Sequence, residues 1–230
     1  MGSLLQKRDY YVSVTLEEQV YVLGGYGSSS PYTTTEILLA DSTTWQQGPP
    51  LPIEMHNGPC AVPISATSFL VFYGREIREF DASIAGPTSS QGWAKKGRWP
   101  ELETSRFYWA GCAKVGGNKV IIAGGYERPS TLHTAEILDL TSRTISEEGK
   151  MSTPRFWFHI ITISYNGDFT TLALAGRGDD FRDDDRKSLN TVEEWKPETA
   201  SWSTVETRLK EKRSYFGLVA APKRLICPSP

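Results

Sequence analysis

A hydrophobic run that ends in glycine recurs four times along the chain at an almost constant interval. The runs end at Gly25, Gly74, Gly125 and Gly176, so that successive glycines lie 49, 51 and 51 residues apart. A period of about fifty residues is typical of proteins built from one repeated supersecondary unit. The sequence therefore predicts several copies of one unit within a single domain that spans residues 1–230.

Each repeat has the same internal order. A basic or histidine residue opens it, and a mixed apolar segment, the glycine-terminated run and a short glutamate-containing segment follow. A polar turn then leads to a tryptophan, at Trp45, Trp93 and Trp202, with Ile145 in that place in the third repeat. Four short β-type segments, bounded by Gly, Pro, Asp and Ser, predict a four-stranded antiparallel sheet in each repeat.

The second segment of each repeat is apolar on both faces. In the second repeat, for example, Leu70, Val71 and Phe72 are consecutive. A small sheet with two apolar faces must pack between copies of itself, which is the arrangement of blades in a β-propeller. The predicted fold class is therefore all-β, with the repeats as blades.

The order of these segments resembles the kelch repeat. Its elements are an apolar run, Gly-Gly, a glutamate segment, a Pro-x-Thr-type turn and tryptophan. The segment 195–202, Trp-Lys-Pro-Glu-Thr-Ala-Ser-Trp, matches the turn closely, and 41–45 matches it more loosely. The second repeat departs from the pattern with the single glycine Gly74. The resemblance implies a kelch-type β-propeller over essentially the whole chain.

The repeats divide the chain into four predicted blades and part of a fifth. The complete four-stranded blades are expected at about 8–52, 56–100, 106–152 and 155–206, and the partial one at 213–230. Kelch propellers mostly have six or seven blades, so we expect an incomplete ring and a fragment of a longer protein. Unpaired edge strands in such a ring predict self-association.

Composition limits the classes of partner. Twenty-five Lys and Arg against 27 Asp and Glu give a net charge of −2, which provides no broad basic surface for nucleic acid. No apolar run approaches the ~20 residues of a membrane-spanning helix, so we expect no membrane partner. The chain has three cysteines, Cys60, Cys112 and Cys227, and this odd number does not indicate a disulfide framework. Cys60 and Cys112 are interpreted as small apolar residues that fill space, not as a cross-link. These features predict a cytoplasmic location.

Candidate binding residues follow from the resemblance. In kelch propellers, the loops after the second strands and the loops between blades share one face, which usually receives the ligand. The side chains expected there are Tyr26, His56, Arg106, Tyr126, Arg155, Arg177 and Arg213. Tyrosine and arginine commonly carry interface energy. The alternative for the repeat-opening arginines is that they bind neighbouring loop carbonyls and hold the blades together.

No motif indicates catalysis. The five aspartates between Asp179 and Asp185 could bind a hard cation or a basic partner, but three arginines between 177 and 186 favour a self-neutralising loop. The three histidines fall in different repeats, and no nucleophile elbow or phosphate-binding glycine loop occurs. We therefore expect a non-catalytic scaffold that binds a peptide or loop of another protein, without a cofactor. The alternative is a carbohydrate-oxidase-like or sugar-processing kelch enzyme.

Overall fold

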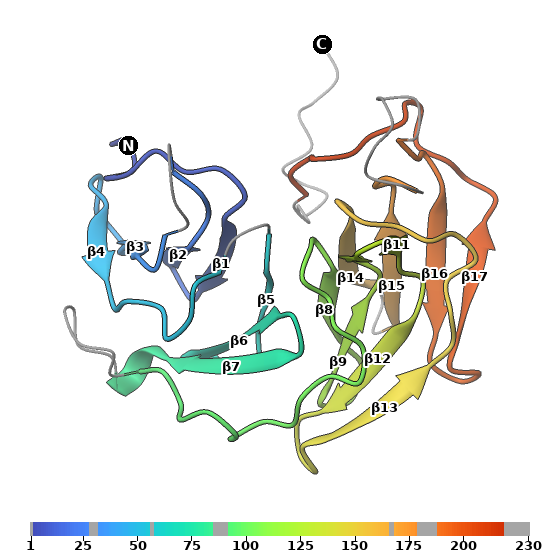
Figure 1. The fold of residues 1–230 in the computed structure, drawn as a ribbon, viewed down its shortest axis with the longest axis horizontal. Helices are drawn as coiled ribbons and strands as arrows, with labels where there is room; N and C mark the ends of the chain where they lie inside the picture. The colour runs from blue at the N-terminus through green and yellow to red at the C-terminus, as the bar shows by residue number, and fades with distance from the viewer. Residues whose placement is uncertain are drawn as a thin grey trace.

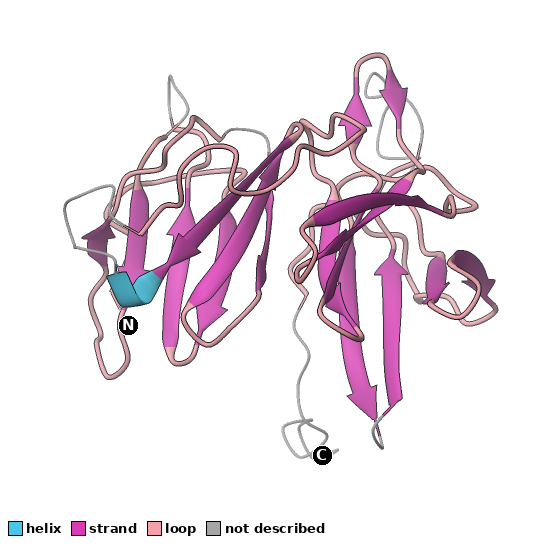
Figure 2. Ribbon diagram, turned by 90° about the horizontal axis from the view of Figure 1, so that it is seen from below, coloured by secondary structure: helices cyan, strands magenta, loops and turns pink. Residues whose placement is uncertain are grey.

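The structure is a computed structural model that describes residues 2–27, 32–55, 58–84, 92–165, 168–178 and 188–218. Nearly all of its regular structure is β-strand, arranged in antiparallel sheets that follow one another along an arc (Figure 1). One short 3-10 turn, η1 (Ala82–Ile84), is the helical element of the described residues (Figure 2). None of these residues forms a helix with the length and apolar character needed to cross a bilayer.

Each repeat forms one sheet whose strands pair in chain order, as the repeat predicts. The first sheet contains β1 (Val12–Leu16), β2 (Gln19–Leu23), β3 (Thr35–Leu38) and β4 (Gln46–Gly48). The second contains β5 (Cys60–Pro63), β6 (Ser68–Tyr73) and β7 (Glu76–Asp81). The third contains β8 (Gly111–Val115), β9 (Lys119–Ala123), β12 (Ala135–Asp139) and β13 (Thr144–Glu148). The fourth contains β14 (His159–Tyr165), β15 (Asp168–Leu174), β16 (Val192–Lys196) and β17 (Ser201–Val205). A small hairpin of β10 (Tyr126–Glu127) and β11 (Ser130–Thr131) extends from the third sheet.

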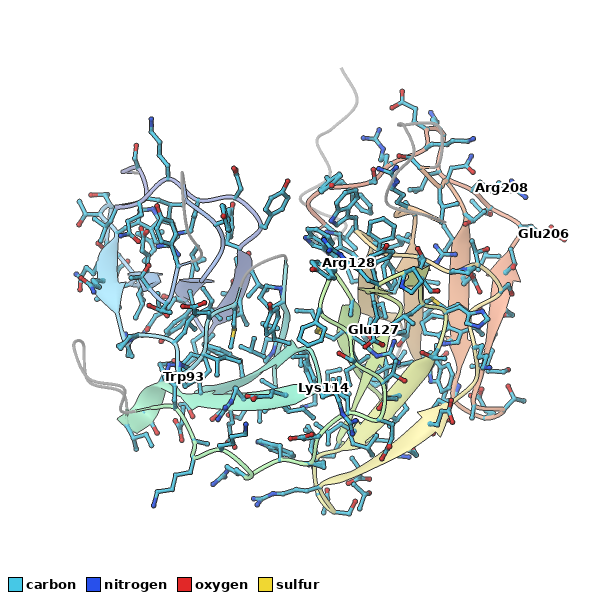
Figure 3. The ribbon with its side chains drawn as sticks, in the orientation of Figure 1. Trp93, Lys114, Glu127, Arg128, Glu206 and Arg208 are labelled. Atoms are coloured by element: carbon cyan, nitrogen blue, oxygen red, sulfur yellow. A yellow bond between two sulfur atoms is a disulfide. The ribbon has the colours of Figure 1, made fainter. Side chains whose placement is uncertain are left out.

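The second sheet departs from the predicted four strands. Its described residues form three strands, and a single antiparallel bridge between Phe80 and Trp93 stands in place of a fourth. Trp93 nevertheless lies where the repeat expects an outer tryptophan, against the ring of Phe80 at 5.1 Å between centroids (Figure 3). The sequence pattern thus located the side chain correctly but overestimated the strand pairing around it.

Stacking of successive sheets confirms the argument from the two-faced second strands. In β9, Ile121 and Ala123 enter the apolar core shared with the fourth sheet, whereas Val120 and Ile122 enter the core shared with the second. All four side chains are fully buried. Each such aliphatic side chain contributes about 1.5–3 kcal/mol when it is removed from water, and both neighbouring sheets are needed for that gain. The sheets therefore stabilise one another in series.

The innermost strands β1, β5, β8 and β14 lie side by side along the inner wall of the arc (Figure 1). Beyond the fourth sheet, the chain returns to this wall at Arg213, which the sequence predicts to open a fifth blade. The carbonyl oxygen of Arg213 accepts a hydrogen bond from the Gly176 amide at 2.9 Å, and Arg213 forms an antiparallel bridge with Leu189. Residues 219–230 of the predicted partial blade lie outside the described residues.

Candidate functional site

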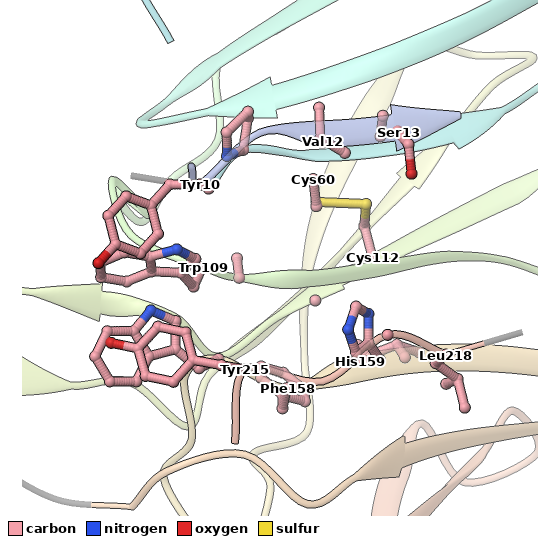
Figure 4. A pocket seen from close by; sticks show the side chains of 18 of the residues that line it. Tyr10, Val12, Ser13, Cys60, Trp109, Cys112, Phe158, His159, Tyr215 and Leu218 are labelled. Carbon is pink, nitrogen blue, oxygen red and sulfur yellow. A yellow bond between two sulfur atoms is a disulfide. The ribbon is translucent and has the colours of Figure 1, made fainter. Parts of the chain in front are cut away.

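A cavity of about 560 Å³ lies between the innermost strands. Its walls are residues of β1, β5, β8 and β14, the residues that lead into these strands, and the segment 215–218. These strands come from four different repeats, so the cavity is the central channel of the blade arrangement. Figure 4 shows Tyr10, Trp109 and Tyr215 gathered at one side of it, and His159 and Leu218 at the other.

Four aromatic residues occupy corresponding positions in four repeats and form what we call the aromatic cluster: Tyr10, Trp109, Trp157 and Tyr215. Three of them, Tyr10, Trp109 and Trp157, lie two residues before an inner strand. All four have left-handed backbone conformations, with φ between 50° and 56°. This conformation is unfavourable for bulky side chains and tends to be retained at functional sites. It turns each ring out of its strand and towards the channel.

The rings of the aromatic cluster contact one another. The centroids of Trp109 and Trp157 are 4.6 Å apart, and those of Trp157 and Tyr215 are 3.4 Å apart. Tyr10 lies 5.5 Å from Trp109 in an edge-on arrangement. Trp157 is buried, whereas Tyr10 and Tyr215 are 44% and 53% exposed. The cluster thus has a packed base and an exposed edge that can receive a flat or apolar group.

Glycine takes the corresponding position in the second repeat. Gly58 also has a positive φ, of 71°, and a Cβ atom there would lie 1.9 Å from Cδ1 of Trp109. The Gly58 amide donates a hydrogen bond to the Tyr10 carbonyl oxygen, and the Trp109 amide donates one to the Gly58 carbonyl oxygen, both at 3.1 Å. Glycine therefore leaves the space that Trp109 fills and continues the backbone connection around the channel.

Three of the residues predicted from the sequence lie beside this cluster. Tyr26, Tyr126 and Arg177 form antiparallel bridges with Asp9, Tyr108 and Phe156, each of which directly precedes a residue of the aromatic cluster. Tyr26 is 39% exposed, but Tyr126 is buried against Tyr108 and Phe156. The Arg177 guanidinium lies 5.6 Å from the ring centre of Trp157, within the range of a cation–π contact.

The structure contradicts the prediction that Arg106 and Arg155 face a partner. Both side chains are buried, and their guanidinium groups pair with Glu136 and Glu193 at 3.0 and 2.5 Å. Arg155 also donates to the Ala175 carbonyl oxygen. Burial lowers the pKa of both guanidinium groups, and the glutamate partner of each opposes this shift. These arginines have the structural role that was the alternative, as does Arg8, which pairs with Glu36 at 2.6 Å.

The same glutamates also hold the connections between blades. Glu193 accepts hydrogen bonds from the backbone amides of Ser152 and Thr153, at 2.6 and 3.1 Å, in the segment that leads into the fourth sheet. Glu136 accepts from Glu103 and Thr104 in the same way, and Glu36 from Leu5 and Gln6. Each buried arginine–glutamate pair therefore fixes both a blade and the loop that enters it.

The described residues of the second repeat contain no pair of this kind. In the third sheet, Glu136 lies opposite Ile122. The corresponding position of the second sheet, opposite Val71, is occupied by Arg78, which pairs with Glu76. Met55 is fully buried, and its carbonyl oxygen accepts a hydrogen bond from the Gly25 amide. The carbonyl oxygen of Arg155 accepts a hydrogen bond from the Gly125 amide in the same way. Met55 thus takes the place of the repeat-opening arginine. The predicted opening residue, His56, lies outside the described residues.

Arg213, which the sequence analysis predicts to lie on the binding face, has an accessible side chain. Its side chain is 53% exposed and lies 3.1 Å from the exposed carboxylate of Glu211. Ion pairs of this kind contribute little to stability, so the guanidinium can exchange its partner at low cost. Arg213 lies two residues before Tyr215 and therefore near the exposed edge of the aromatic cluster.

The cysteines correct a further prediction. Cys60 in β5 and Cys112 in β8 form a disulfide in the channel wall, with their Cα atoms 6.0 Å apart (Figure 4). Their interpretation as apolar fillers without a cross-link was wrong. The reason is that the two residues lie on adjacent inner strands of neighbouring sheets, which a separation of 52 residues does not reveal. Cys227 lies outside the described residues.

Among the described residues of the channel wall, His159 is the one with a basic side chain. Its Nε2 atom donates a hydrogen bond to the Phe216 carbonyl oxygen. Burial lowers its pKa below the ordinary 6.5, and this hydrogen bond partly opposes the shift. Among the described ranges, no three His, Cys, Asp or Glu side chains come together as a metal site would require. The aspartate-rich segment 179–185 lies outside the described residues.

Sequence reasoning missed the aromatic cluster because it stopped at the opening arginine of each repeat. The signal was nevertheless present, since an aromatic residue follows two or three positions after Arg8, Arg106, Arg155 and Arg213. What the sequence does not contain is the left-handed backbone, which decides that these rings point into the channel. A pattern of residue types alone places them on a strand end and leaves their direction open.

Comparison with known proteins agrees with this architecture. Residues 7–52, which form the first sheet and its entry segment, match the Kelch motif. The comparison with curated proteins returned no match. Kelch motifs are generally found in protein-interaction scaffolds, which are commonly non-enzymatic. The strand order of the matched segment recurs in the third and fourth sheets, and its first three strands recur in the second, so a Kelch motif opens a chain of repeated antiparallel sheets.

Proposed function

We propose that the protein is a non-catalytic scaffold that binds an extended peptide or loop of another protein at the aromatic cluster. The observation that carries this proposal is the left-handed conformation of four bulky aromatic residues at corresponding positions. Backbone strain at one position can be incidental. The same unfavourable conformation in four repeats, with all four rings at one cavity, supports a shared binding role.

The chemistry of the cavity supports a peptide ligand. None of the described residues that line it is Asp, Glu, Lys or Arg, so an apolar or aromatic side chain can enter without leaving a charge unpaired. Tyrosine and tryptophan provide a large contact area at low entropic cost and are enriched among residues that dominate binding energy. Tyr26, Arg177 and Arg213 lie around the cluster and supply polar contacts for the flanking backbone of the peptide.

A carbohydrate-oxidase-like or sugar-processing enzyme remains the alternative prediction from the sequence. Self-association through unpaired strand edges and a cytoplasmic location remain predictions from the sequence.

Peptide selection tests the proposal. Random twelve-residue peptides displayed on phage would be selected against the purified chain, and their affinities measured by fluorescence anisotropy. The double variant Tyr10→Ala/Tyr215→Ala removes two exposed rings of the cluster, and we expect selected peptides to bind it at least about tenfold more weakly. Phe169→Ala is the matched control, because this ring is 62% exposed at the β14–β15 hairpin and does not line the channel.

Two results would contradict the proposal. One is a selection that enriches no peptide against the folded protein. The other is a set of peptides that bind the double variant as tightly as the unmodified chain, since their site would then lie elsewhere. Circular dichroism of each variant confirms that the sheets are intact before affinities are compared.

A further inference from the structure

The Cys60–Cys112 disulfide joins two sheets whose described strands share no backbone ladder. Cys60 belongs to β5 in the second sheet and Cys112 to β8 in the third. Apart from this bond, the described contact between these sheets consists mainly of side-chain packing around Leu70, Phe72 and Ile122. The disulfide is therefore a covalent connection across the boundary between two blades.

The bond is also accessible from the channel. Both cysteines are partly buried, and both line the cavity of about 560 Å³. No charged side chain of the lining blocks the approach of an anionic thiolate, and His159 is the lining residue that can carry positive charge. Disulfides that are buried in an apolar core are inert, whereas access and thiolate attack determine the reactivity of exposed ones.

We propose that Cys60 and Cys112 are a thiol–disulfide site, reduced in the folded protein by dithiol reagents that enter the channel and reoxidised by reagents in the disulfide form, which take the two electrons back. One thiolate of the dithiol attacks one cysteine sulfur and breaks the bond between the two cysteines. The other cysteine leaves as a thiolate and takes a proton from solvent. The second thiolate of the dithiol then attacks the mixed disulfide, releases the first cysteine and becomes the oxidised reagent. Two electrons pass to the protein, with two protons from solvent.

The position of the bond connects this chemistry to the aromatic cluster. Cys60 follows Gly58 by two residues and Cys112 follows Trp109 by three, and Gly58 and Trp109 are joined by one backbone hydrogen bond of 3.1 Å. When the disulfide is reduced, these strands are held by non-covalent contacts: this hydrogen bond, the backbone bridge between Gly74 and Arg106, the hydrogen bond from Lys114 to the Ile64 carbonyl oxygen, and the apolar packing. The redox state thus sets how firmly one part of the cluster is held, whether or not a partner is present.

Thiol counting tests the site without any partner. The variant Cys227→Ser leaves Cys60 and Cys112 as the remaining cysteines. After equilibration with oxidised glutathione and unfolding in guanidinium, we expect almost no thiols to react with Ellman's reagent. After treatment of the folded protein with dithiothreitol, we expect both cysteines to react. The reaction should proceed without denaturant, because the channel admits the reagent.

Thermal unfolding tests the connection between blades. A cross-link across 52 residues constrains the unfolded chain, so reduction should lower the Tm by about 5–15 °C. The triple variant Cys60→Ser/Cys112→Ser/Cys227→Ser is the matched control, and dithiothreitol should leave its Tm unchanged. Free thiols in the oxidised sample, reduction that requires denaturant, or an unchanged Tm would each overturn the proposal. These readouts involve no ligand, so they stand or fall separately from the proposed function.

Discussion

Replacing Glu193 by glutamine tests the role of the buried arginine–glutamate pairs. Glu193 and Arg155 both have side chains with no exposed surface, and the carboxylate accepts bonds from Arg155 and from the amides of Ser152 and Thr153. Glutamine has nearly the same shape, so the packing is kept. It removes the negative charge, however, and turns one acceptor into an NH₂ group that faces another donor.

The expected loss follows from the burial of Arg155. Removing one partner of a buried ion pair leaves an uncompensated charge, at a cost of about 3–5 kcal/mol in the free energy of unfolding. The control is Glu194→Gln at the next position of β16, where the carboxylate is 25% exposed and pairs with Lys196, itself 43% exposed. A surface pair of this kind contributes at most about 1 kcal/mol. The two substitutions therefore make the same chemical change in two different environments.

Urea unfolding followed by tryptophan fluorescence measures both free energies, with the m value as a check that the same transition is compared. The double variant Arg155→Met/Glu193→Leu separates charge from packing, because it removes both charged groups. We expect it to be more stable than Glu193→Gln. If Glu193→Gln costs no more than Glu194→Gln, the argument that these pairs fix the blades is wrong.

Three further predictions concern the channel. Gly58→Ala should destabilise the protein by about 1–3 kcal/mol, measured by urea unfolding, because its Cβ would collide with Trp109 and its φ is 71°; an unchanged midpoint would refute this packing. Tyr10→Gly should keep the Tm or raise it, since glycine relieves the left-handed backbone of an exposed residue, while peptide binding weakens; a fall in Tm with binding intact would contradict both expectations. Stability should decrease as the pH falls below about 6.5, because the pKa of His159 is lowered in the folded state and the unfolded chain binds the proton first. His159→Gln should remove this part of the pH dependence in unfolding measurements between pH 5 and 7, and an unchanged slope would assign it to other groups.

The repeated sheets were predictable because their signal is local and recurs. Each glycine-terminated run is apolar at successive positions, and a strand of that kind must be covered on both faces. The structure confirms this in β9, where Ile121 and Ile122 enter two different cores. The stacking order follows from the period, since short connections make consecutive repeats neighbours in space.

The site was only partly predictable because its decisive features depend on backbone direction and on contacts between repeats. Tyr26 and Arg177 were predicted to lie on the binding face, and the structure places them beside the aromatic cluster, but the repeat-opening arginines could equally have faced solvent or the interior. Their burial is decided by Glu136 and Glu193, which lie 30 and 38 residues further along the chain. The disulfide depends in the same way on which inner strands are adjacent, and composition does not contain that information.

At the four left-handed positions of the channel, the backbone conformation determines the direction of the side chain, whichever residue type is present. Any residue that tolerates this conformation would therefore place its side chain at the same point. Gly58 already illustrates an empty position in this series. Substitutions at these four positions can therefore change which ligands bind without changing the blades. This end of the channel is a suitable place to engineer new binding specificity into the chain.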